Sequence, residues 1–302
     1  MSKIKVKIEE KNDGMVIRQF LKEEMGLSTR LIRSASIEKR ILVNDEPVRM
    51  RKVIKVGDVV EVELSRNESQ NITPENIPID IIYEDEDILV VNKPPFMVVH
   101  PTKSHQSGTL ANGILYYFSE SNQNCIVRLV SRLDMNTSGL IIIAKNQFAH
   151  MALSKEMQNN NLEKRYIAIV HGHMEEEQGT IDAPIYKLDT EEDSFRRVVD
   201  DRGQRSITHY KVIERLKEAD VVECLLETGR THQIRVHLSH LGHPIYGDTL
   251  YGYGEEDAEK EFIDRQALHA YKLKFNSPRT KVLLDLKADI PEDMQKLIYK
   301  LK

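Results

Sequence analysis

The stretch Cys125–Asn146, CIVRLVSRLDMNTSGLIIIAKN, places a polar loop between two apolar runs. Both runs, Ile126–Val130 and Leu140–Ala144, have the length and the β-branched composition of buried strands. The only carboxylate in the loop between them, Ser131–Gly139, is that of Asp134. Because strands hold both ends of such a loop, it can present a reactive group on a rigid scaffold. The stretch therefore predicts a strand–loop–strand unit with Asp134 as the candidate for chemistry.

Strand-like runs also dominate the chain on either side of this unit. They are Ile79–Tyr83, Ile88–Val91, Arg165–Val170, Ile207–Ile213 and Val221–Glu227. The chief helical patterns are Gln147–Gln158 and Thr231–Leu241. Since strands outnumber helices and do not alternate with them one for one, the pattern argues against a doubly wound fold. We expect an α+β domain with a mixed, mainly antiparallel sheet, flanking helices and a central cleft.

The first 64 residues have a pattern of their own. A run of apolar residues at helical spacing ends at Gly26, and Ser28 stands at the N-cap position of a second helix. Short strands are expected at 41–43, 53–56 and 59–64. The next stretch, SRNESQNITPENIP, is polar, contains two prolines and lacks periodicity, which is typical of a linker. We therefore predict a small α/β domain over residues 1–64, a linker over 65–77 and a larger domain over 78–302.

Charge is distributed unevenly along the 302 residues. The net charge is −5, yet residues 1–66 contain 15 Lys and Arg against 11 Asp and Glu, whereas the remainder contains 28 against 37. A basic first module on an acidic body suggests that attraction to a polyanion is local to that module. The alternative for its basic second helix is a solvated face. The basic residues concerned are Arg30, Arg33, Lys39 and Arg40.

The sequence lacks the patterns of membrane insertion and secretion. No apolar run approaches the roughly 18 residues of a transmembrane helix, and Met1–Lys7 alternates charged with aliphatic residues as a strand does. Cys125 and Cys224 lie far apart in apolar stretches, so we expect buried thiols in a reducing compartment. These features favour a cytoplasmic protein, and nothing in the sequence requires more than a monomer.

Several motifs in a fixed order resemble the RluA-type RNA pseudouridine synthases. Taken alone, an Arg-x-Asp pair is most often a surface ion pair, but Arg132–Asp134 and the residues after it match the family motif R-L-D-x-x-T/S-S-G-L-x-x-x-A-K. Downstream, Lys164–Ala168 resembles the K-x-Y-x-A strand, and Gly229–Arg235 resembles the G-R-T-H-Q-I/L-R segment. The resemblance spans roughly residues 78–275. One departure is Ser131, where many members have His, and it affects only details of RNA contact.

The resemblance implies isomerisation of uridine to pseudouridine within RNA, without redox change or group transfer and hence without a cofactor. Asp134 would attack C1′ or remove the 2′ proton, and Arg235 would keep it ionised. Tyr166 would stack on the flipped uracil, and the resemblance leaves open a further role at the C5 proton. Judged from their own surroundings alone, Tyr166 would be a core residue and Arg235 a helix-surface charge.

Further residues would hold the RNA. By resemblance, Arg132 would help to keep the target nucleotide outside its helix, and Arg230 would contact a phosphate near the start of its own helix. Residues 13–64 resemble the S4-like RNA-binding module, whose second helix lies against RNA phosphates. That resemblance assigns the same role to the four basic residues of the second helix named above.

Four histidines, at 232, 237, 240 and 243, invite comparison with a zinc site. The interleaved Ile234, Val236 and Leu238 instead favour packing and hydrogen bonding around the cleft, and other zinc ligand types are absent nearby. We expect no metal.

Three functions remain to be weighed. Large-subunit ribosomal RNA is the expected substrate, because family members with this front module act there, and transfer RNA is the alternative. A non-catalytic RNA-binding or ribosome-assembly factor is disfavoured by the intact Asp134, Tyr166 and Arg235. A glycoside hydrolase would need a second acid with a motif around it, which the sequence lacks.

Overall fold

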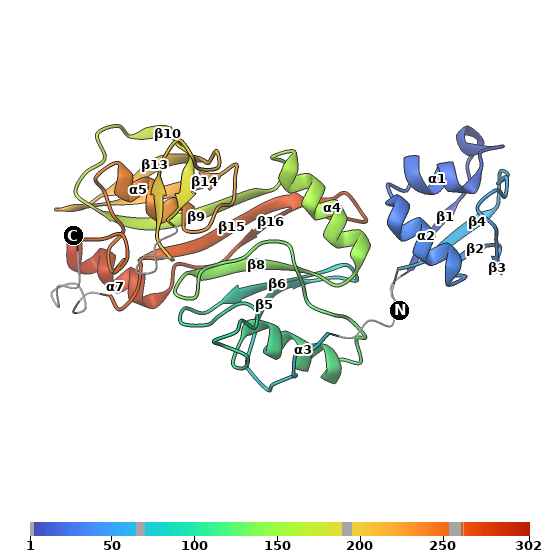
Figure 1. Ribbon diagram of the computed structural model, residues 1–302, viewed down its shortest axis with the longest axis horizontal. Coiled ribbons are helices and arrows are strands. Elements are labelled where there is room, and N and C mark those ends of the chain that lie inside the picture. Colours follow the sequence, from blue (N-terminus) through green and yellow to red (C-terminus); the bar gives the residue numbers. More distant parts are fainter. Residues whose placement is uncertain (1–2, 65–69, 189–194, 254–260, 262) are drawn as a thin grey trace.

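The computed structural model describes residues 3–64, 70–188, 195–253, 261 and 263–302. Residues 65–69 of the predicted linker lie outside these ranges, and the domain limits at residues 64 and 78 stay predictions. The described chain forms a four-stranded sheet near the N-terminus and a ten-stranded sheet after it. Figure 1 shows the four-stranded unit at one end of the molecule, beside α4 (Gln147–Gln158). No helix in the described ranges is long and apolar enough to cross a membrane.

The N-terminal unit combines two helices with a sheet of strand order β1-β4-β2-β3. Its elements are β1 (Lys3–Lys7), a 3-10 helix (Glu10–Asn12), α1 (Ile17–Glu23), α2 (Thr29–Ile37), β2 (Ile41–Val43), β3 (Glu46–Pro47) and β4 (Val59–Glu63). The predicted cap of α2 is confirmed, because Ser28 Oγ accepts a hydrogen bond from the Leu31 amide at 3.1 Å. Apolar side chains of both helices and of the sheet share one buried core.

One predicted strand of this unit, at residues 53–56, is wrong. Val53 makes only an isolated bridge to Val16, and the amide of Ile54 donates to the Met15 carbonyl at 3.0 Å. The segment therefore lies along the chain that enters α1. Ile54 is its only buried residue, so the apolar pattern reflects one core side chain and not pairing at a sheet edge.

The large sheet has the strand order β10-β13-β14-β9-β15-β8-β6-β5, with β16 on β15 and β7 on β8. Its strands are β5 (Asp80–Glu84), β6 (Ile88–Lys93), β7 (Arg128–Leu129), β8 (Ser138–Ala144), β9 (Glu163–His171), β10 (Gln178–Asp182), β13 (Ile207–Arg215), β14 (Ala219–Leu226), β15 (Leu268–Asn276) and β16 (Leu283–Lys287). Every pairing between described strands of this sheet is antiparallel except β8 with β15. The prediction of a mixed, mainly antiparallel sheet in an α+β fold is confirmed.

Helices cover both faces at the centre of this sheet. On β8, Ile141 and Ile143 belong to the core shared with α3 (Leu110–Glu120), whereas Leu140 and Ile142 belong to the core shared with α4. Since side chains alternate between the two faces of a strand, covering both faces explains why this run is apolar throughout.

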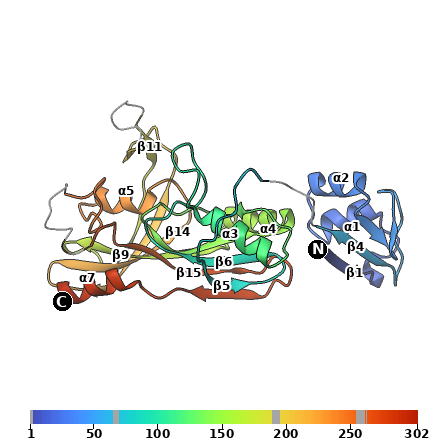
Figure 2. The ribbon, with the colours of Figure 1, turned by 90° about the horizontal axis from the view of Figure 1, so that it is seen from below.

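A cleft opens on the α3 side of the sheet, because its lining includes Val99, Val127 and Tyr166 of the core shared with α3. Two further helices, α5 (Gln233–His240) and α7 (Glu292–Leu301), contribute apolar residues to the same core. A two-stranded ribbon of β11 (Ile185–Lys187) and β12 (Arg197–Val199) projects from the α5 side, as Figure 2 shows.

Gly139 fixes the entry of the Asp134 loop into β8. Its φ is +117°, and a Cβ at this position would lie 2.3 Å from the Ala270 carbonyl oxygen of β15. Only glycine can adopt this backbone conformation and permit so close an approach. Beside it, Ser138 Oγ and His269 Nδ1 are 2.9 Å apart, which joins the two strands at their parallel pairing. The loop is thus anchored at its C-terminal end.

Candidate active site

Asp134 lies in the loop between β7 and β8, and several contacts hold this loop in place. The Thr137 amide donates to the Asp134 carbonyl at 3.1 Å, and Gln266 Nε2 donates to Thr137 Oγ1 at 3.2 Å. Lys93 Nζ donates to the Met135 carbonyl at 2.9 Å. The Asp134 side chain is 29% exposed and lines a cleft of about 750 Å³. The carboxylate is therefore fixed in position and still open to a ligand.

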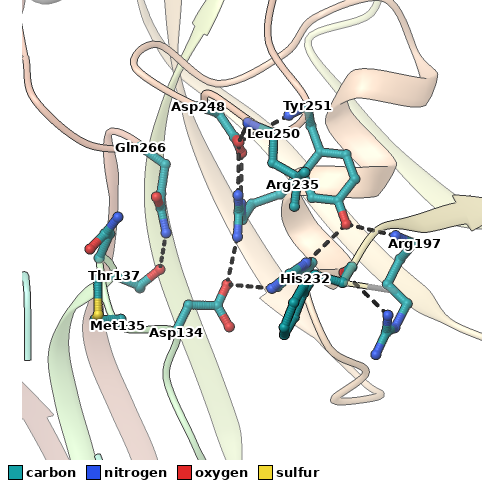
Figure 3. Close-up of polar contacts among 12 residues, drawn as sticks. Asp134, Met135, Thr137, Arg197, His232, Arg235, Asp248, Leu250, Tyr251 and Gln266 are labelled. Atoms are coloured by element: carbon teal, nitrogen blue, oxygen red, sulfur yellow. Dashed lines mark hydrogen bonds and ion pairs between the residues drawn. The ribbon is translucent and has the colours of Figure 1, made fainter. Parts of the chain in front are cut away.

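Arg235 of α5 binds the Asp134 carboxylate from inside the protein (Figure 3). Its Nη1 lies 3.1 Å from Asp134 Oδ2, while its Nε and Nη2 lie 2.6 and 2.8 Å from the two oxygens of Asp248. The side chain of Asp248 is fully buried and that of Arg235 is 8% exposed. Burial alone would lower the pKa of Arg235, but Asp248 and then Asp134 raise it. The guanidinium is therefore permanently charged beside Asp134.

His232 forms the next part of this network. Its Nε2 lies 3.9 Å from Asp134 Oδ2, and its Nδ1 lies 2.9 Å from the Tyr251 hydroxyl. The same hydroxyl accepts a hydrogen bond from the Arg197 amide at 2.9 Å. Burial lowers the pKa of His232, although the charge of Asp134 opposes this. A neutral imidazole is the favoured form near neutral pH.

The predicted helix over Thr231–Leu241 begins two residues later than expected. His232 has a left-handed conformation, with φ of 59°, so the helix starts at Gln233. The side chain of Gln233 is buried. Its Oε1 accepts a hydrogen bond from the Arg230 backbone amide at 3.0 Å, and its Nε2 donates to the Ile207 carbonyl at 2.9 Å. This side chain ties the loop before α5 to β13.

Tyr166 of β9 is 7% exposed, belongs to the main core and also lines the cleft. The sequence left open whether Tyr166 is a core residue or a cleft residue, and in the structure it is both. Burial, and secondarily the charge of Asp134, raise its pKa above the ordinary value. Tyr166 therefore presents a neutral ring and hydroxyl at physiological pH.

Cations dominate the charged lining of the cleft. The lining residues include Arg132, Lys164, Arg230 and Arg235, and their single carboxylate is Asp134. Arg132 and Arg230 are exposed. Among the described residues, the ion-pair partners of Asp134 are Arg235 and the more distant His232, so the local Arg132–Asp134 pair considered from sequence is not formed. The surplus of positive charge suits a polyanionic ligand.

Two family models match the chain. Residues 87–240, just over half of it, match the family described as RNA pseudouridylate synthase. The matched segment contains Asp134, Tyr166 and Arg235. The chain belongs to the RNA pseudouridylate synthase family. Members of this family are isomerases that act on RNA. Residues 4–60 match the RluD ribosomal pseudouridine synthase N-terminal domain.

Known relatives of the synthase cover most of its length. It is 40% identical over 286 residues to an uncharacterized RNA pseudouridine synthase, YjbO, of Bacillus subtilis (strain 168). This alignment covers 94% of this chain and 98% of that protein. It is also 40% identical over 256 residues to the ribosomal large subunit pseudouridine synthase D of Zymomonas mobilis, covering 82% and 80% respectively. Among solved structures, human RNA pseudouridylate synthase domain containing 1 superposes with a TM-score of 0.57 at 28% identity, covering 70% of this chain and 83% of that one.

The sequence assigned no role to Lys93 and Asp248, which support the site of the synthase from behind. Lys93 is fully buried, and its ammonium donates to the carbonyls of Pro94, Met97 and Met135 at 2.8, 3.0 and 2.9 Å. Burial, and then the charge of Arg265, lower its pKa to about 7. Asp248 follows Gly247 in the sequence, but a single carboxylate in a loop predicts no partner.

On the N-terminal unit, Arg30, Arg33 and Lys39 are exposed. None of the three has an ion-pair partner within the ranges that the structure describes. Arg40 differs, because its side chain is 10% exposed, its Nε lies 2.9 Å from Glu38 Oε2 and its Nη1 donates to the Glu63 carbonyl at 2.5 Å. Three of the four RNA-contacting residues predicted on this unit are therefore open to a ligand, and the fourth joins α2 to the sheet.

The histidines near the cleft have partners other than a metal. His237 contacts Thr208 Oγ1 and the Ala183 carbonyl at 2.9 and 3.0 Å, and His243 contacts the His171 carbonyl at 3.0 Å. Within the described part of the chain, no group of three or more His, Cys, Asp or Glu side chains is arranged to hold a metal ion.

Proposed function

We propose that this synthase converts specific uridines of large-subunit ribosomal RNA to pseudouridine, with Asp134 as its catalytic carboxylate. The observation that carries the proposal is the position of Asp134, held at 3.1 Å by a charged, buried Arg235 in a cleft that Tyr166 also lines. The ribosomal substrate is supported by the Zymomonas mobilis relative, whose name specifies the large ribosomal subunit.

The reaction cuts the C1′–N1 bond, turns the uracil and joins C5 to C1′. Asp134 acts on the ribose, either by attack at C1′ or by removal of the 2′ proton. Arg235 keeps this carboxylate ionised in a site from which bound RNA excludes water. Because Asp248 holds Arg235 by two hydrogen bonds, the guanidinium cannot swing away when substrate enters.

Tyr166 supports the base while it turns. An aromatic face binds a rotating ring without the angular demands of hydrogen bonds. Since its pKa is raised, the phenol stays protonated, so a role at the C5 proton would have to begin from the neutral hydroxyl.

RNA is held at two places in this proposal. At the cleft mouth, the exposed Arg132 and Arg230 contact the target nucleotide and its phosphates. In the S4-like module of residues 1–64, Arg30, Arg33 and Lys39 on and after α2 contact phosphates of the surrounding RNA. Arg40 fixes α2 to β4 and supports the orientation of these side chains.

The synthase is proposed to act as a monomer in the cytoplasm, without a cofactor. Its RNA substrate and its free thiols, Cys125 and Cys224, suit a reducing compartment. The isomerisation conserves every atom of the substrate, so the chemistry requires no redox or group-transfer partner.

Substitution of Asp134 by Asn tests the proposal. Tritium release from large-subunit ribosomal RNA labelled at uridine C5 is expected to fall about 10⁴-fold or more, because the neutral amide can neither attack nor accept the proton. RNA affinity should stay within about 3-fold of wild type, since the amide keeps the size of the carboxylate. The surface substitution Asp182→Asn is the matched control. If the variant released tritium at the wild-type rate, Asp134 would have no part in the mechanism. If the wild-type protein released tritium from transfer RNA alone, transfer RNA would be the substrate in place of ribosomal RNA.

A further inference from the structure

Lys164 is a buried cation of the cleft that no described residue neutralises. It lies on β9 two residues before Tyr166, is 7% exposed and lines the same cleft. Its ammonium has no hydrogen-bond or ion-pair partner among the residues that the structure describes. Two other poorly exposed lysines contrast with it, because Lys93 donates to three carbonyls and Lys145 pairs with Glu84 at 2.8 Å.

In the free protein, the buried ammonium of Lys164 has neither a counter-charge nor a hydrogen-bond acceptor among the described residues. Removing a cation from water is unfavourable unless a counter-charge or hydrogen bonds replace the lost hydration. Burial accordingly lowers the pKa of Lys164. An anion that enters the cleft would supply the missing interaction.

The neighbouring residues leave this ammonium open to the cleft. A Cβ added at Gly229 would lie 3.4 Å from Lys164 Nζ, so any side chain there would lie against the ammonium. Arg230, the next residue, is exposed at the rim of the same cleft. The one carboxylate in the lining, Asp134, is bound to Arg235. Nothing in the described lining offers Lys164 a counter-charge, whereas Arg230, the neighbour of Gly229, adds a second cation to the same lining.

We propose that Lys164 binds an RNA phosphate adjoining the target uridine, and that this contact holds the nucleotide in the cleft. The inference rests on the proposed function, in which Tyr166 carries the uracil. Residues two apart on one face of a strand are separated by about 7 Å, so Lys164 lies beside the base position and not beneath it. A phosphate also carries full charge in the resting complex, whereas uracil becomes anionic only transiently. These two features favour the phosphate over the base as its ligand.

Substitution of Lys164 by Met removes the charge and keeps the length of the side chain. Affinity for a substrate RNA is expected to fall about 10-fold, and the slope of log affinity against log salt should decrease by about 0.7, the value for one phosphate of a single strand. The kcat at saturating RNA should change less than about 3-fold. Lys164→Arg should restore most of the slope, and Lys211→Met, at an exposed position on β13, should leave both quantities unchanged.

A lower kcat at unchanged KM and unchanged salt slope would overturn the proposal, since it would assign Lys164 to the base. An unaltered affinity, slope and kcat would overturn it as well. Because affinity and its salt slope are measured without turnover, they test Lys164 even if the tritium assay contradicts the proposed substrate.

A modified RNA tests the same contact in the wild-type protein, which avoids any folding defect of the variant. Methylphosphonate linkages, which are uncharged, are placed one at a time on either side of the target uridine. One of the two should weaken wild-type binding about 10-fold and should not weaken Lys164→Met further, because the two changes remove one interaction. Equal binding of both modified RNAs and the unmodified RNA would contradict the proposal.

Discussion

The guanidinium of Arg235 lies within the cleft, where two carboxylates hold it, whereas those of Arg30 and Arg33 stand exposed on α2. Hydrogen bonds hold the first guanidinium in one orientation, in which it contacts Asp134 Oδ2. The others lack ion-pair partners in the described ranges and can adapt to phosphates at varied positions. In the proposed function, the fixed charge serves chemistry at one bond and the adaptable charges serve attachment to RNA.

Within this comparison, the largest effect on activity is expected when the charge of Asp248, which holds Arg235, is removed. Asp248→Asn leaves a buried guanidinium with Asp134 as its only ionic partner among the described residues, so Asp134 is pulled from its position or Arg235 shifts. We expect kcat/KM to fall at least about 100-fold and the free energy of unfolding to decrease by about 3 kcal/mol. Tritium release and chemical denaturation measure the two effects.

The exposed pair of Asp182 and Arg205 provides the control for this experiment. Their side chains are 44% and 73% exposed, and Asp182→Asn should leave activity and stability close to wild type. If Asp248→Asn behaved like this control, the buried network would have no part in holding Asp134.

A smaller effect is expected on α2. The double substitution Arg30→Met and Arg33→Met should weaken RNA binding about 10-fold near physiological salt and lower the salt slope by about 1.5, since two phosphate contacts are lost. The kcat at saturating RNA should not change, because the cleft is untouched. Arg18→Met, at an exposed position of α1, is the control. An equal loss of RNA affinity in the control would mean that the general charge of the module binds RNA, and not α2 in particular.

The smallest effect concerns Lys93, whose charge depends on its burial. The ordinary pKa of 10.5 applies to the unfolded chain, and burial lowers the folded value to about 7. Between these values the unfolded chain binds the proton and the folded chain does not, so stability rises with pH. Relative to Lys93→Met, wild type should gain about 1 kcal/mol between pH 6 and 8. Urea denaturation at the two pH values measures this gain.

Lys22→Met, an exposed substitution on α1, should retain the wild-type pH dependence. Parallel pH profiles for wild type and Lys93→Met would mean that Lys93 stays charged in the fold. The three carbonyls around it would then be sufficient to hold an ammonium.

Local pattern was sufficient for much of the fold. The helix Gln147–Gln158 matches its predicted bounds, because Asn146 caps it and its apolar spacing is regular. The helix Leu110–Glu120 was missed, although Thr109 and Asn112 form a capping box and Ile114 and Phe118 continue the helical spacing. Its signal therefore lay in the sequence, in the cap and in the apolar spacing.

Other features had no local signal. His232 takes a left-handed conformation that shortens α5, and its ring contacts Tyr251, 19 residues away. Lys164 and Arg132 are both basic residues beside strands, yet one is buried and the other exposed. Periodicity indicates which side chains share a face, but it does not say what covers that face.

By itself, the sequence determined the polar loop with Asp134, the main strands of an antiparallel sheet and the order of motifs that mark the family. These are properties of short segments, set by apolar spacing and by residue type. The pairing of Asp134 with Arg235, 101 residues away, was expected from the family resemblance and not from local pattern, which offered its neighbour Arg132. Only the tertiary structure decided that Asp248 fixes that partner. The reason is physical: an ion pair depends on where the sheet brings two distant segments together, and on how completely the surrounding core removes them from water.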